Sequence, residues 1–230
     1  MNIAIIPARG GSKRIPKKNI KIFNGKPMIY WAIRNAINSN CFDRIIVSTD
    51  DNEIASIAKK YNAEVPFKRP KNLADDYTLT QDVIKHCLDW LNHSNYSVEN
   101  VCCIYPATPL INKEDILKAK KILEISEDQI SVFSATKFPY PIERGLLIDE
   151  NGYSRLIKPD LYNKRSQDCI EAYHDAGQFY WASKIYWNKM KNIFHKSKPY
   201  LIPSWRVQDI DNNEDWRRAE IIFDLLQKYQ

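Results

Sequence analysis

Arginine and lysine residues gather around the first two glycines of the chain. The segment IPARGGSKRIPKKN, residues 6–19, contains Arg9, Lys13 and Arg14, and no acidic residue occurs between positions 9 and 26. Glycines let backbone N–H groups approach a ligand closely, and Arg and Lys supply charged donors for phosphate oxygens. The segment follows an apolar run, residues 3–6, that is typical of a buried strand, and loops after such strands often bind phosphate. We therefore expect an anion-binding loop; a solvated basic loop is the alternative.

Two common phosphate-binding loops do not fit this segment. A P-loop requires G-x-x-x-x-G-K-[ST], whereas Gly25-Lys26 is followed by Pro27, and the G-x-G-x-x-G spacing of a dinucleotide-binding loop is absent. The loop of a nucleotidyltransferase fits better, because such an enzyme positions a nucleoside triphosphate and neutralises charge at the α-phosphorus. A nucleic-acid site is disfavoured because no stacking aromatics alternate with the basic residues and no nucleic-acid-binding signature occurs.

Two carboxylates near the end of the chain have the spacing of a divalent-cation site. Asp209 and Asp211 are two residues apart, so both side chains point to one side of an extended segment. Carboxylate oxygens suit Mg²⁺, whose octahedral shell phosphates and water can complete. Asp211 also stands three residues before Glu214, which is the spacing of a helix capping box, so the residues alone leave both interpretations open.

Alternating strand and helix patterns must position these groups. Strand patterns occupy residues 3–6, 44–48, 101–105, 130–135 and 178–183, and helical patterns begin at Pro27 and at Asp50 or Asp51 and cover residues 83–91, 114–125 and 214–228. This order predicts parallel strands joined by helical crossovers, hence a three-layer α/β sandwich with a mostly parallel sheet. Pro and Gly interrupt the alternation between residues 138 and 176. We expect a single domain over residues 1–230, with residues 138–176 as an inserted arm.

Composition narrows the class of protein. Hydrophobic residues make up 44% and charged residues 27% of the 230 residues, which excludes global disorder, and the net charge is +6. The five cysteines include no C-x-x-C pair and the four histidines are scattered, so we expect neither a disulfide framework nor a zinc site. No apolar run approaches the roughly 20 residues that span a bilayer, and no signal-peptide pattern is present, so we expect a soluble cytoplasmic protein.

Six motifs together extend over nearly the whole chain: IPARGGSKRIPKKNIKIFNGKPMI, VSTDDNEIA, AEVPFKRPKNLADDYT, RSQD, AYHDAGQFYW and RVQDIDNNEDW. They resemble the motifs of CMP-sialic acid synthetases, the acylneuraminate cytidylyltransferase family. RSQD, AYHDAGQFYW and the Arg14 that follows GSK resemble the branch acting on pseudaminic acid, a nine-carbon keto-sugar acid. The resemblance implies a Rossmann-like sheet of the nucleotide-diphospho-sugar transferase type, CTP and a sugar acid as substrates, Mg²⁺ as cofactor, and a homodimer with contacts in the arm.

The resemblance also assigns roles by motif position. Arg9, Lys13 and Asp209 would act in catalysis, and Asp209 and Asp211, after Gln208, would bind the metal. Arg69 and Thr80 would lie near the cytosine or ribose. The complete implied nucleotide-binding set is Ala8, Arg9, Gly10, Gly11, Ser12, Lys13, Lys18, Asn19, Arg69, Thr80 and Tyr105.

A sugar-acid site needs hydrogen-bonding groups for hydroxyl and acetamido substituents, a cation for the carboxylate and an aromatic floor. The arm and the motif that follows it would provide this mixture through Arg165, Gln167, His174, Asp175, Gln178 and Tyr180. The alternative is an aromatic core strand in which His174 and Asp175 form a surface pair.

The sequence therefore predicts a Mg²⁺-dependent cytidylyltransferase in which the anomeric hydroxyl of pseudaminic acid attacks the α-phosphorus of CTP. Its product would serve surface glycans, such as those of flagellin, and neither nucleic acid nor a membrane is expected as a partner. A CMP-sialic or CMP-legionaminic acid synthetase is the alternative within the family. A catalytically silent nucleotide-binding protein is the alternative from another class.

Overall fold

A central sheet organises the protein, and the computed structural model describes residues 1–190 and 192–228. In these residues the main sheet has six strands, in the order β10 (Ser197–Leu201), β6 (Ser131–Lys137), β9 (Tyr173–Ser183), β5 (Asn100–Ile104), β1 (Asn2–Pro7) and β4 (Arg44–Ser48). β9 runs antiparallel to both neighbours, whereas β1 is parallel to β4 and β5, and β10 is parallel to β6. The prediction of a mostly parallel sheet is confirmed.

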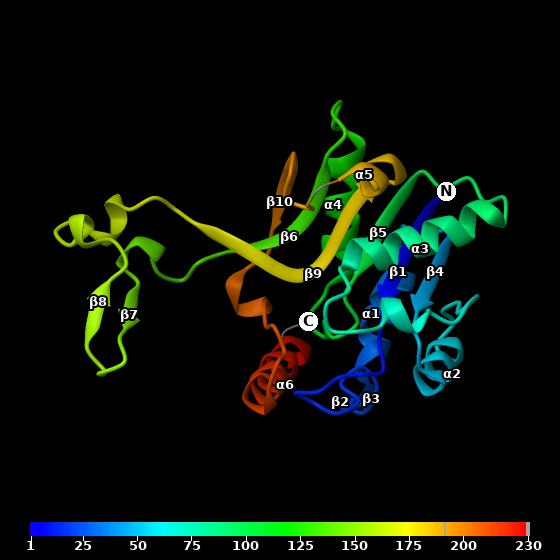
Figure 1. Ribbon diagram of the computed structural model, residues 1–230, viewed down its shortest axis with the longest axis horizontal. Helices are drawn as coiled ribbons and strands as arrows, with labels where there is room; N and C mark the ends of the chain where they lie inside the picture. Colours follow the sequence, from blue (N-terminus) through cyan, green and yellow to red (C-terminus); the bar gives the residue numbers. More distant parts are fainter. Residues whose placement is uncertain (191, 229–230) are drawn as a thin grey trace.

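Helices cover both faces of the sheet, which confirms the predicted three layers (Figure 1). One apolar core joins the sheet to α1 (Met28–Asn38), α2 (Asn52–Lys60) and α4 (Lys113–Glu124). A second core joins the opposite face to α3 (Thr80–His93) and α5 (Lys184–Lys189). The last helix, α6 (Asn213–Lys228), packs beside α1, where the Trp31 and Phe223 rings lie 4.5 Å apart. In the described part of the chain, no helix combines the length and the apolar composition needed to cross a membrane.

Local sequence signals explain where several elements begin. α1 starts directly after Pro27, and α2 starts after Asp51, whose carboxylate accepts hydrogen bonds from the backbone N–H groups of Glu53 and Ile54.

The sequence did not predict three features: the hairpin of β2 (Ile22–Phe23) and β3 (Lys26–Pro27), the helix α5, and the strand β10. β10 is an edge strand containing Pro199, and its partly exposed residues lack a clear strand pattern.

Residues 138–172 leave the body as a long arm (Figure 1). The arm is carried by the ends of β6 and β9, which are still paired at Lys137 and Tyr173, and it contains the hairpin of β7 (Leu146–Ile148) and β8 (Ser154–Leu156). Short 3₁₀ turns at Ile142–Arg144, Pro159–Leu161 and Ser166–Asp168 complete it. Large apolar side chains on the arm are exposed; among them are Leu146, Ile148, Tyr153, Tyr162 and Ile170.

Candidate active site

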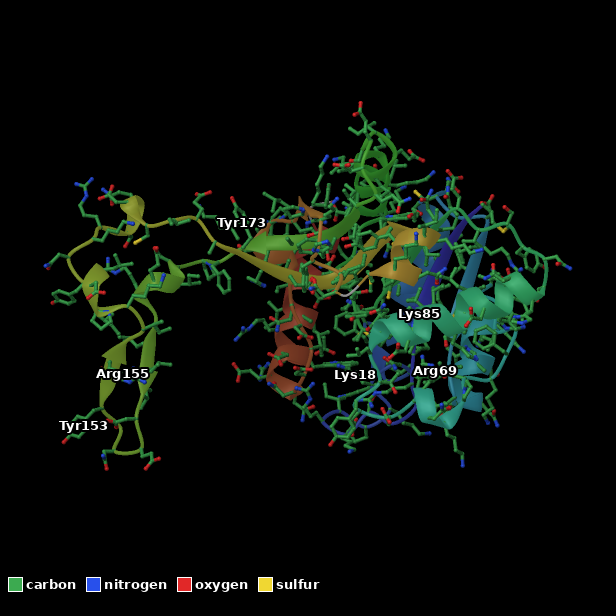
Figure 2. The ribbon with its side chains drawn as sticks, turned by 45° about the horizontal axis from the view of Figure 1, so that its top comes forward. Lys18, Arg69, Lys85, Tyr153, Arg155 and Tyr173 are labelled. Atoms are coloured by element: carbon green, nitrogen blue, oxygen red, sulfur yellow. The ribbon has the colours of Figure 1, made fainter. Side chains whose placement is uncertain are left out.

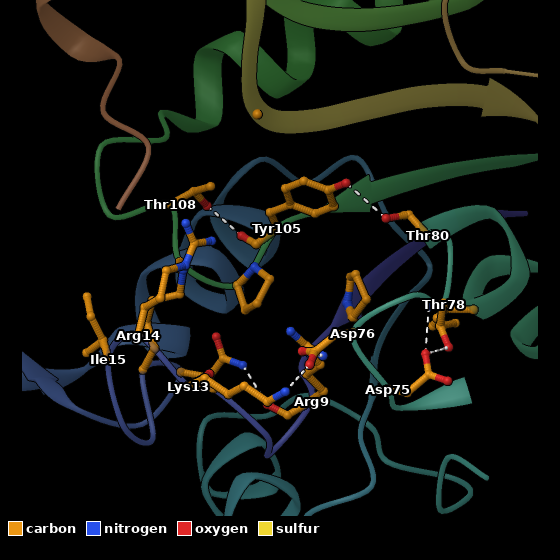
Figure 3. Close-up of a pocket in the computed structure, with 18 of the residues that line it drawn as sticks. Arg9, Lys13, Arg14, Ile15, Asp75, Asp76, Thr78, Thr80, Tyr105 and Thr108 are labelled. Atoms are coloured by element: carbon orange, nitrogen blue, oxygen red, sulfur yellow. Dashed lines mark hydrogen bonds and ion pairs between the residues drawn. The ribbon is translucent and has the colours of Figure 1, made fainter. Parts of the chain in front are cut away.

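The basic loop, residues 9–19, lines a cavity of about 320 Å³ at the carboxyl ends of β1 and β5 (Figure 3). Arg9, Lys13, Arg14 and Lys18 all contribute to its wall. Ser12 and Asn19 of the same loop also line the cavity, together with predicted residues from distant parts of the chain: Arg69, Thr80, Tyr105 and Asp209. Ligands of open α/β sheets collect at this edge, so the fold brings together most of the predicted nucleotide-binding set.

Hydrogen bonds from within the loop and from behind it determine its shape. The buried Asn19 donates from Nδ2 to the carbonyl oxygen of Arg9 (3.0 Å), and Lys18 Nζ donates to the carbonyl oxygen of Ile210 (2.7 Å). Asn19 therefore acts on the loop backbone, and Lys18 ties the loop to the segment that carries Asp209.

Ala8, Gly10 and Gly11 were predicted to bind the nucleotide but do not line the cavity. Ala8 is buried, and its N–H donates to the carbonyl oxygen of Ser48 (2.9 Å). The N–H of Gly10 donates to Asp50 Oδ1 (3.0 Å), and a Cβ atom at Gly10 would lie 2.8 Å from Asp51 Oδ2. Gly10 thus allows the loop to pack against the start of α2, whereas a Cβ atom at Gly11 would meet nothing within 4 Å.

Carboxylates neutralise the cations of the basic loop. Asp76 Oδ1 lies 2.6 Å from Arg9 Nη1, and Asp76 Oδ2 also accepts a hydrogen bond from Lys13 Nζ. These bonds, first that from Lys13 and then that from Arg9, lower the pKa of Asp76, so it is charged at neutral pH. Asp211 forms a second pair with Arg14 (2.6 Å), and Lys18 Nζ lies 3.8 Å from Asp211 Oδ1. The segment that looked purely basic in the sequence is therefore paired with acids in the folded chain.

Arg69, Thr80 and Tyr105 form the inner wall of the cavity. Arg69 is 4% exposed, and its Nε donates to Ser48 Oγ (3.1 Å). Burial lowers the pKa of Arg69. Thr80, at the start of α3, shares a hydrogen bond of 2.9 Å with the Tyr105 hydroxyl. Burial raises the pKa of Tyr105 to about 12, so this phenol stays protonated and can act as a hydrogen-bond donor.

A second cavity of about 260 Å³ adjoins the first and shares the walls formed by Thr80 and Tyr105. Asp175 and Tyr180 line it together with apolar side chains: Leu79, Trp187, Met190, Ile193 and Phe194. The Tyr180 hydroxyl donates to Asp175 Oδ2, and the Gly177 N–H donates to Asp175 Oδ1 (2.8 Å). The second cavity therefore has one charged polar group in largely apolar surroundings.

A bulge in β9 brings Asp175 and Tyr180 to the same side. Side chains that are an odd number of positions apart in a regular strand face opposite sides of the sheet. Between the pairs Phe133–Tyr180 and Ala135–Asp175, β9 advances five residues while β6 advances two, and Gly177 has a φ of +61°. The irregularity reverses the alternation, so both side chains reach the second cavity.

Asp209 and Asp211 lie where the C-terminal segment meets the basic loop. Asp209 lines the first cavity, and its pKa is raised by burial and then by the neighbouring charge of Asp211. The helix-capping alternative for Asp211 does not describe this structure, because Asn212 Oδ1 accepts from the N–H groups of Glu214 (2.8 Å) and Asp215 (3.0 Å). Among the residues described, no preformed group of three or more acidic, histidine or cysteine side chains is arranged around a cation. Two carboxylates at the edge of a basic cavity nevertheless fit a Mg²⁺ ion that takes its other ligands from phosphate and water.

Comparison with known proteins decides the family. The sequence model described as "Cytidylyltransferase" matches residues 3–166. The chain belongs to the cytidylyltransferase family. It is 44% identical over 223 residues to a pseudaminic acid cytidylyltransferase of Campylobacter jejuni, with 96% of each chain covered. It is 34% identical over 233 residues to a CMP-N,N'-diacetyllegionaminic acid synthase of Legionella pneumophila, covering 98% of this chain and 97% of the relative.

The fold of this cytidylyltransferase is shared with more distant proteins. A solved structure of CMP:2-keto-3-deoxy-manno-octonic acid synthetase complexed with CTP superposes with a TM-score of 0.70 at 13% identity, covering 100% of this chain and 99% of that one. A 4-diphosphocytidyl-2C-methyl-D-erythritol synthase from Anaerococcus prevotii superposes with a TM-score of 0.61 at 17% identity, covering 98% of both chains. At such identities the likeness concerns the fold alone.

Four predicted substrate residues of the cytidylyltransferase do not line either cavity of their own chain. Gln178 is 3% exposed and donates from Nε2 to the carbonyl oxygen of Arg206 (3.0 Å), so it joins β9 to the turn at Ser204–Arg206. His174 packs its ring against Phe138, with centroids 4.7 Å apart. Arg165 and Gln167 belong to the arm, which projects away from the body that carries Lys18 and Arg69 (Figure 2).

Sequence reasoning missed the acidic pair at positions 75 and 76. Both residues line the first cavity, and Asp76 contacts two of the predicted catalytic cations. The motif AEVPFKRPKNLADDYT contains both acids, but the resemblance assigns them no role. Two adjacent acids in a motif that also contains Arg69, a predicted nucleotide-binding residue, were the signal that could have identified them.

Proposed function

We propose that this chain transfers the cytidylyl group of CTP to pseudaminic acid and releases pyrophosphate. The observation that carries the proposal is the pair of adjoining cavities, one lined by basic side chains and the other by a carboxylate among apolar groups. An enzyme that joins a nucleotide to a second substrate needs two such spaces meeting at the reacting atoms. The relative that is 44% identical is itself a pseudaminic acid cytidylyltransferase, which supports this choice of substrate.

The basic loop would bind the triphosphate and stabilise the charge that moves to the leaving group. The anomeric oxygen of the sugar forms a bond to the α-phosphorus, and the proton of that hydroxyl passes to water. The bond from the phosphorus to the bridging oxygen breaks, and pyrophosphate leaves with the electron pair. Arg9 and Lys13 are suited to this role because a fork of N–H donors and a point charge converge on one place in the cavity wall. Arg69 and Tyr105 would shape the inner end, where the nucleoside lies.

A Mg²⁺ ion belongs to the same proposal, with Asp209 and Asp211 as its protein ligands. When bound, it would neutralise phosphate charge and polarise the phosphorus centre. Asp211 would have to exchange its pair with Arg14 for the metal, which would leave the Arg14 guanidinium available to a substrate anion.

The second cavity would hold the sugar acid. Asp175 can accept hydrogen bonds from a hydroxyl or an amide N–H, and the surrounding Leu79, Met190, Ile193 and Phe194 can pack against acyl and methyl groups. The shared wall of Thr80 and Tyr105 would then bring the sugar beside the triphosphate.

We also propose a homodimer in the cytoplasm, held together through the arm. The arm exposes apolar side chains such as Leu146, Ile148 and Tyr162, which a second copy could cover. Arg165 and Gln167 could then reach the cavity of that second copy, since they do not line the cavities of their own chain. Sedimentation equilibrium tests the dimer, and a monomer at micromolar concentration would contradict it.

Pyrophosphate release tests the function directly. The purified protein is incubated with CTP, Mg²⁺ and, in separate reactions, pseudaminic, legionaminic and sialic acid. Release with pseudaminic acid above the other two is the expected result. Release only with legionaminic or sialic acid would move the chain to that branch of the family, and CTP binding without release from any sugar acid would favour a silent nucleotide-binding protein.

A further inference from the structure

The carboxylate of Asp76 contacts the two basic side chains that would bind phosphate. Its two carboxylate oxygens are divided between Arg9, at 2.6 Å from Oδ1, and Lys13, which donates to Oδ2. All three residues line the first cavity, and Figure 3 shows the Asp76 carboxylate against the Arg9 and Lys13 side chains. A carboxylate bridging a guanidinium and an ammonium resembles, in charge and geometry, the way a phosphate would use the same donors.

The segment around Asp76 is built to present this carboxylate. Asp75 Oδ1 accepts hydrogen bonds from the N–H groups of Tyr77 (2.9 Å) and Thr78 (2.7 Å) and from the Thr78 hydroxyl (2.7 Å). These bonds stay inside residues 75–78 and form a tight turn. Asp76, in contrast, reaches across to a loop 63 positions earlier in the chain. The neighbouring Tyr77 side chain is 90% exposed, so the turn sits at the surface and has room to move outward.

We propose that Asp76 is an intramolecular counter-ion that holds Arg9 and Lys13 when the nucleotide is absent and is displaced by the phosphates of the incoming triphosphate. The inference rests on the proposed function, because it takes the first cavity to be the triphosphate site. Displacement involves no covalent step: two ion pairs with Asp76 are exchanged for ion pairs with phosphate oxygens.

Two features favour displacement over simultaneous contact. A carboxylate left between Arg9 and Lys13 would lie beside a polyanion, and like charges at such short separations repel. The Asp76 side chain is also 34% exposed, so it can return to water at low cost once its partners are taken. The opposite role is that Asp76 stays in place and orients the two cations for phosphate; the two roles predict opposite effects of removing its charge.

The test is calorimetric titration of Asp76→Asn and wild-type protein with metal-free inorganic pyrophosphate and, separately, with CTP and Mg²⁺ in the absence of sugar acid. Displacement predicts that Asp76→Asn binds both ligands roughly two- to tenfold more tightly, the range expected for two partly exposed ion pairs. The gain should fall as salt is raised, because exposed pairs are screened. It should also shrink in a Lys13→Ala background, since the competing contact is then already weakened.

Glu53→Gln is the matched control. It removes the charge of another acid that pairs with the basic loop, 2.6 Å from Lys17 Nζ, and neither Glu53 nor Lys17 lines the first cavity. We expect its affinity for pyrophosphate to change less than about twofold. Equal or weaker pyrophosphate binding by Asp76→Asn, or a gain that Glu53→Gln reproduces, would overturn the counter-ion role. Wild-type protein that binds pyrophosphate but not CTP would instead count against the proposed function, with the pyrophosphate comparison still deciding the role of Asp76.

Discussion

Replacing Gly10 by alanine tests how the basic loop is held against the fold. The new Cβ would lie 2.8 Å from Asp51 Oδ2 and 2.9 Å from Asp51 Cβ, distances that require Asp51 to move. Asp51 caps α2, so its displacement costs about 1 kcal/mol, and the overpacking itself costs about 1–3 kcal/mol. We expect Gly10→Ala to lower the free energy of unfolding by about 2–4 kcal/mol, which corresponds to a fall in Tm of roughly 4–16 °C for a chain of this size.

Urea titration followed by circular dichroism measures this loss, with Gly11→Ala as the control. An alanine at position 11 would meet no atom within 4 Å, so its free energy of unfolding should stay within about 0.5 kcal/mol of wild type. A second variant, Asp51→Gly, removes the side chain that is in the way, and a glycine cap costs only about 0.5 kcal/mol.

The double variant Gly10→Ala/Asp51→Gly should therefore recover most of the loss caused by Gly10→Ala. A Gly10→Ala protein as stable as Gly11→Ala would refute the reasoning. Strict additivity in the double variant would show that the clash is not with Asp51.

Three further expectations follow from buried groups and from the proposed metal site. Asp115→Ala should lower the free energy of unfolding in urea by about 3–5 kcal/mol, because it removes the carboxylate that lies 2.8 Å from the largely buried Arg206 guanidinium. A loss below about 1 kcal/mol would contradict this. At pH 8 a thiol reagent should quickly modify only Cys169 of the five cysteines. The other four are buried, and burial raises the pKa of Cys87 to about 12. Rapid labelling of a second thiol in folded protein would be inconsistent with the structure. Asp209→Ala should lower turnover by more than about a hundredfold without lowering Tm, and a rate that does not change across a Mg²⁺ titration would argue against the metal role.

Much of the fold could be predicted because its signals are local. Buried parallel strands appear as short apolar runs, and Asp51 marks the start of α2 by the residue type that caps helices. β10 could not be found this way, since its place at the edge depends on pairing with β6 and its own residues are partly exposed. The short α5 is likewise held by tertiary packing of Tyr186 and Trp187.

The basic residues of the candidate site could be predicted from the sequence, whereas their pairing with acidic residues could not. The basic loop is contiguous, so its residue types are visible in one short segment. Its counter-ions are not, because Asp76 and Asp211 come from segments far along the chain and only folding brings them to Arg9 and Arg14. The shared orientation of Asp175 and Tyr180 was also hidden, since a regular strand would have placed them on opposite faces.

The long strand β9 has a consequence for how the lengths of related chains can vary. Its second half is a central strand between β5 and β6, and its first half supports the arm. An insertion at the tip of the arm, in the turn around Gly152 between β7 and β8, would lengthen the hairpin and leave the strand pairing of β9 unchanged. A one-residue insertion between Gln178 and Ser183 would turn the remaining side chains of β9 to the wrong face of the sheet. Arm length and nucleotide site can therefore diverge separately, although one strand carries both.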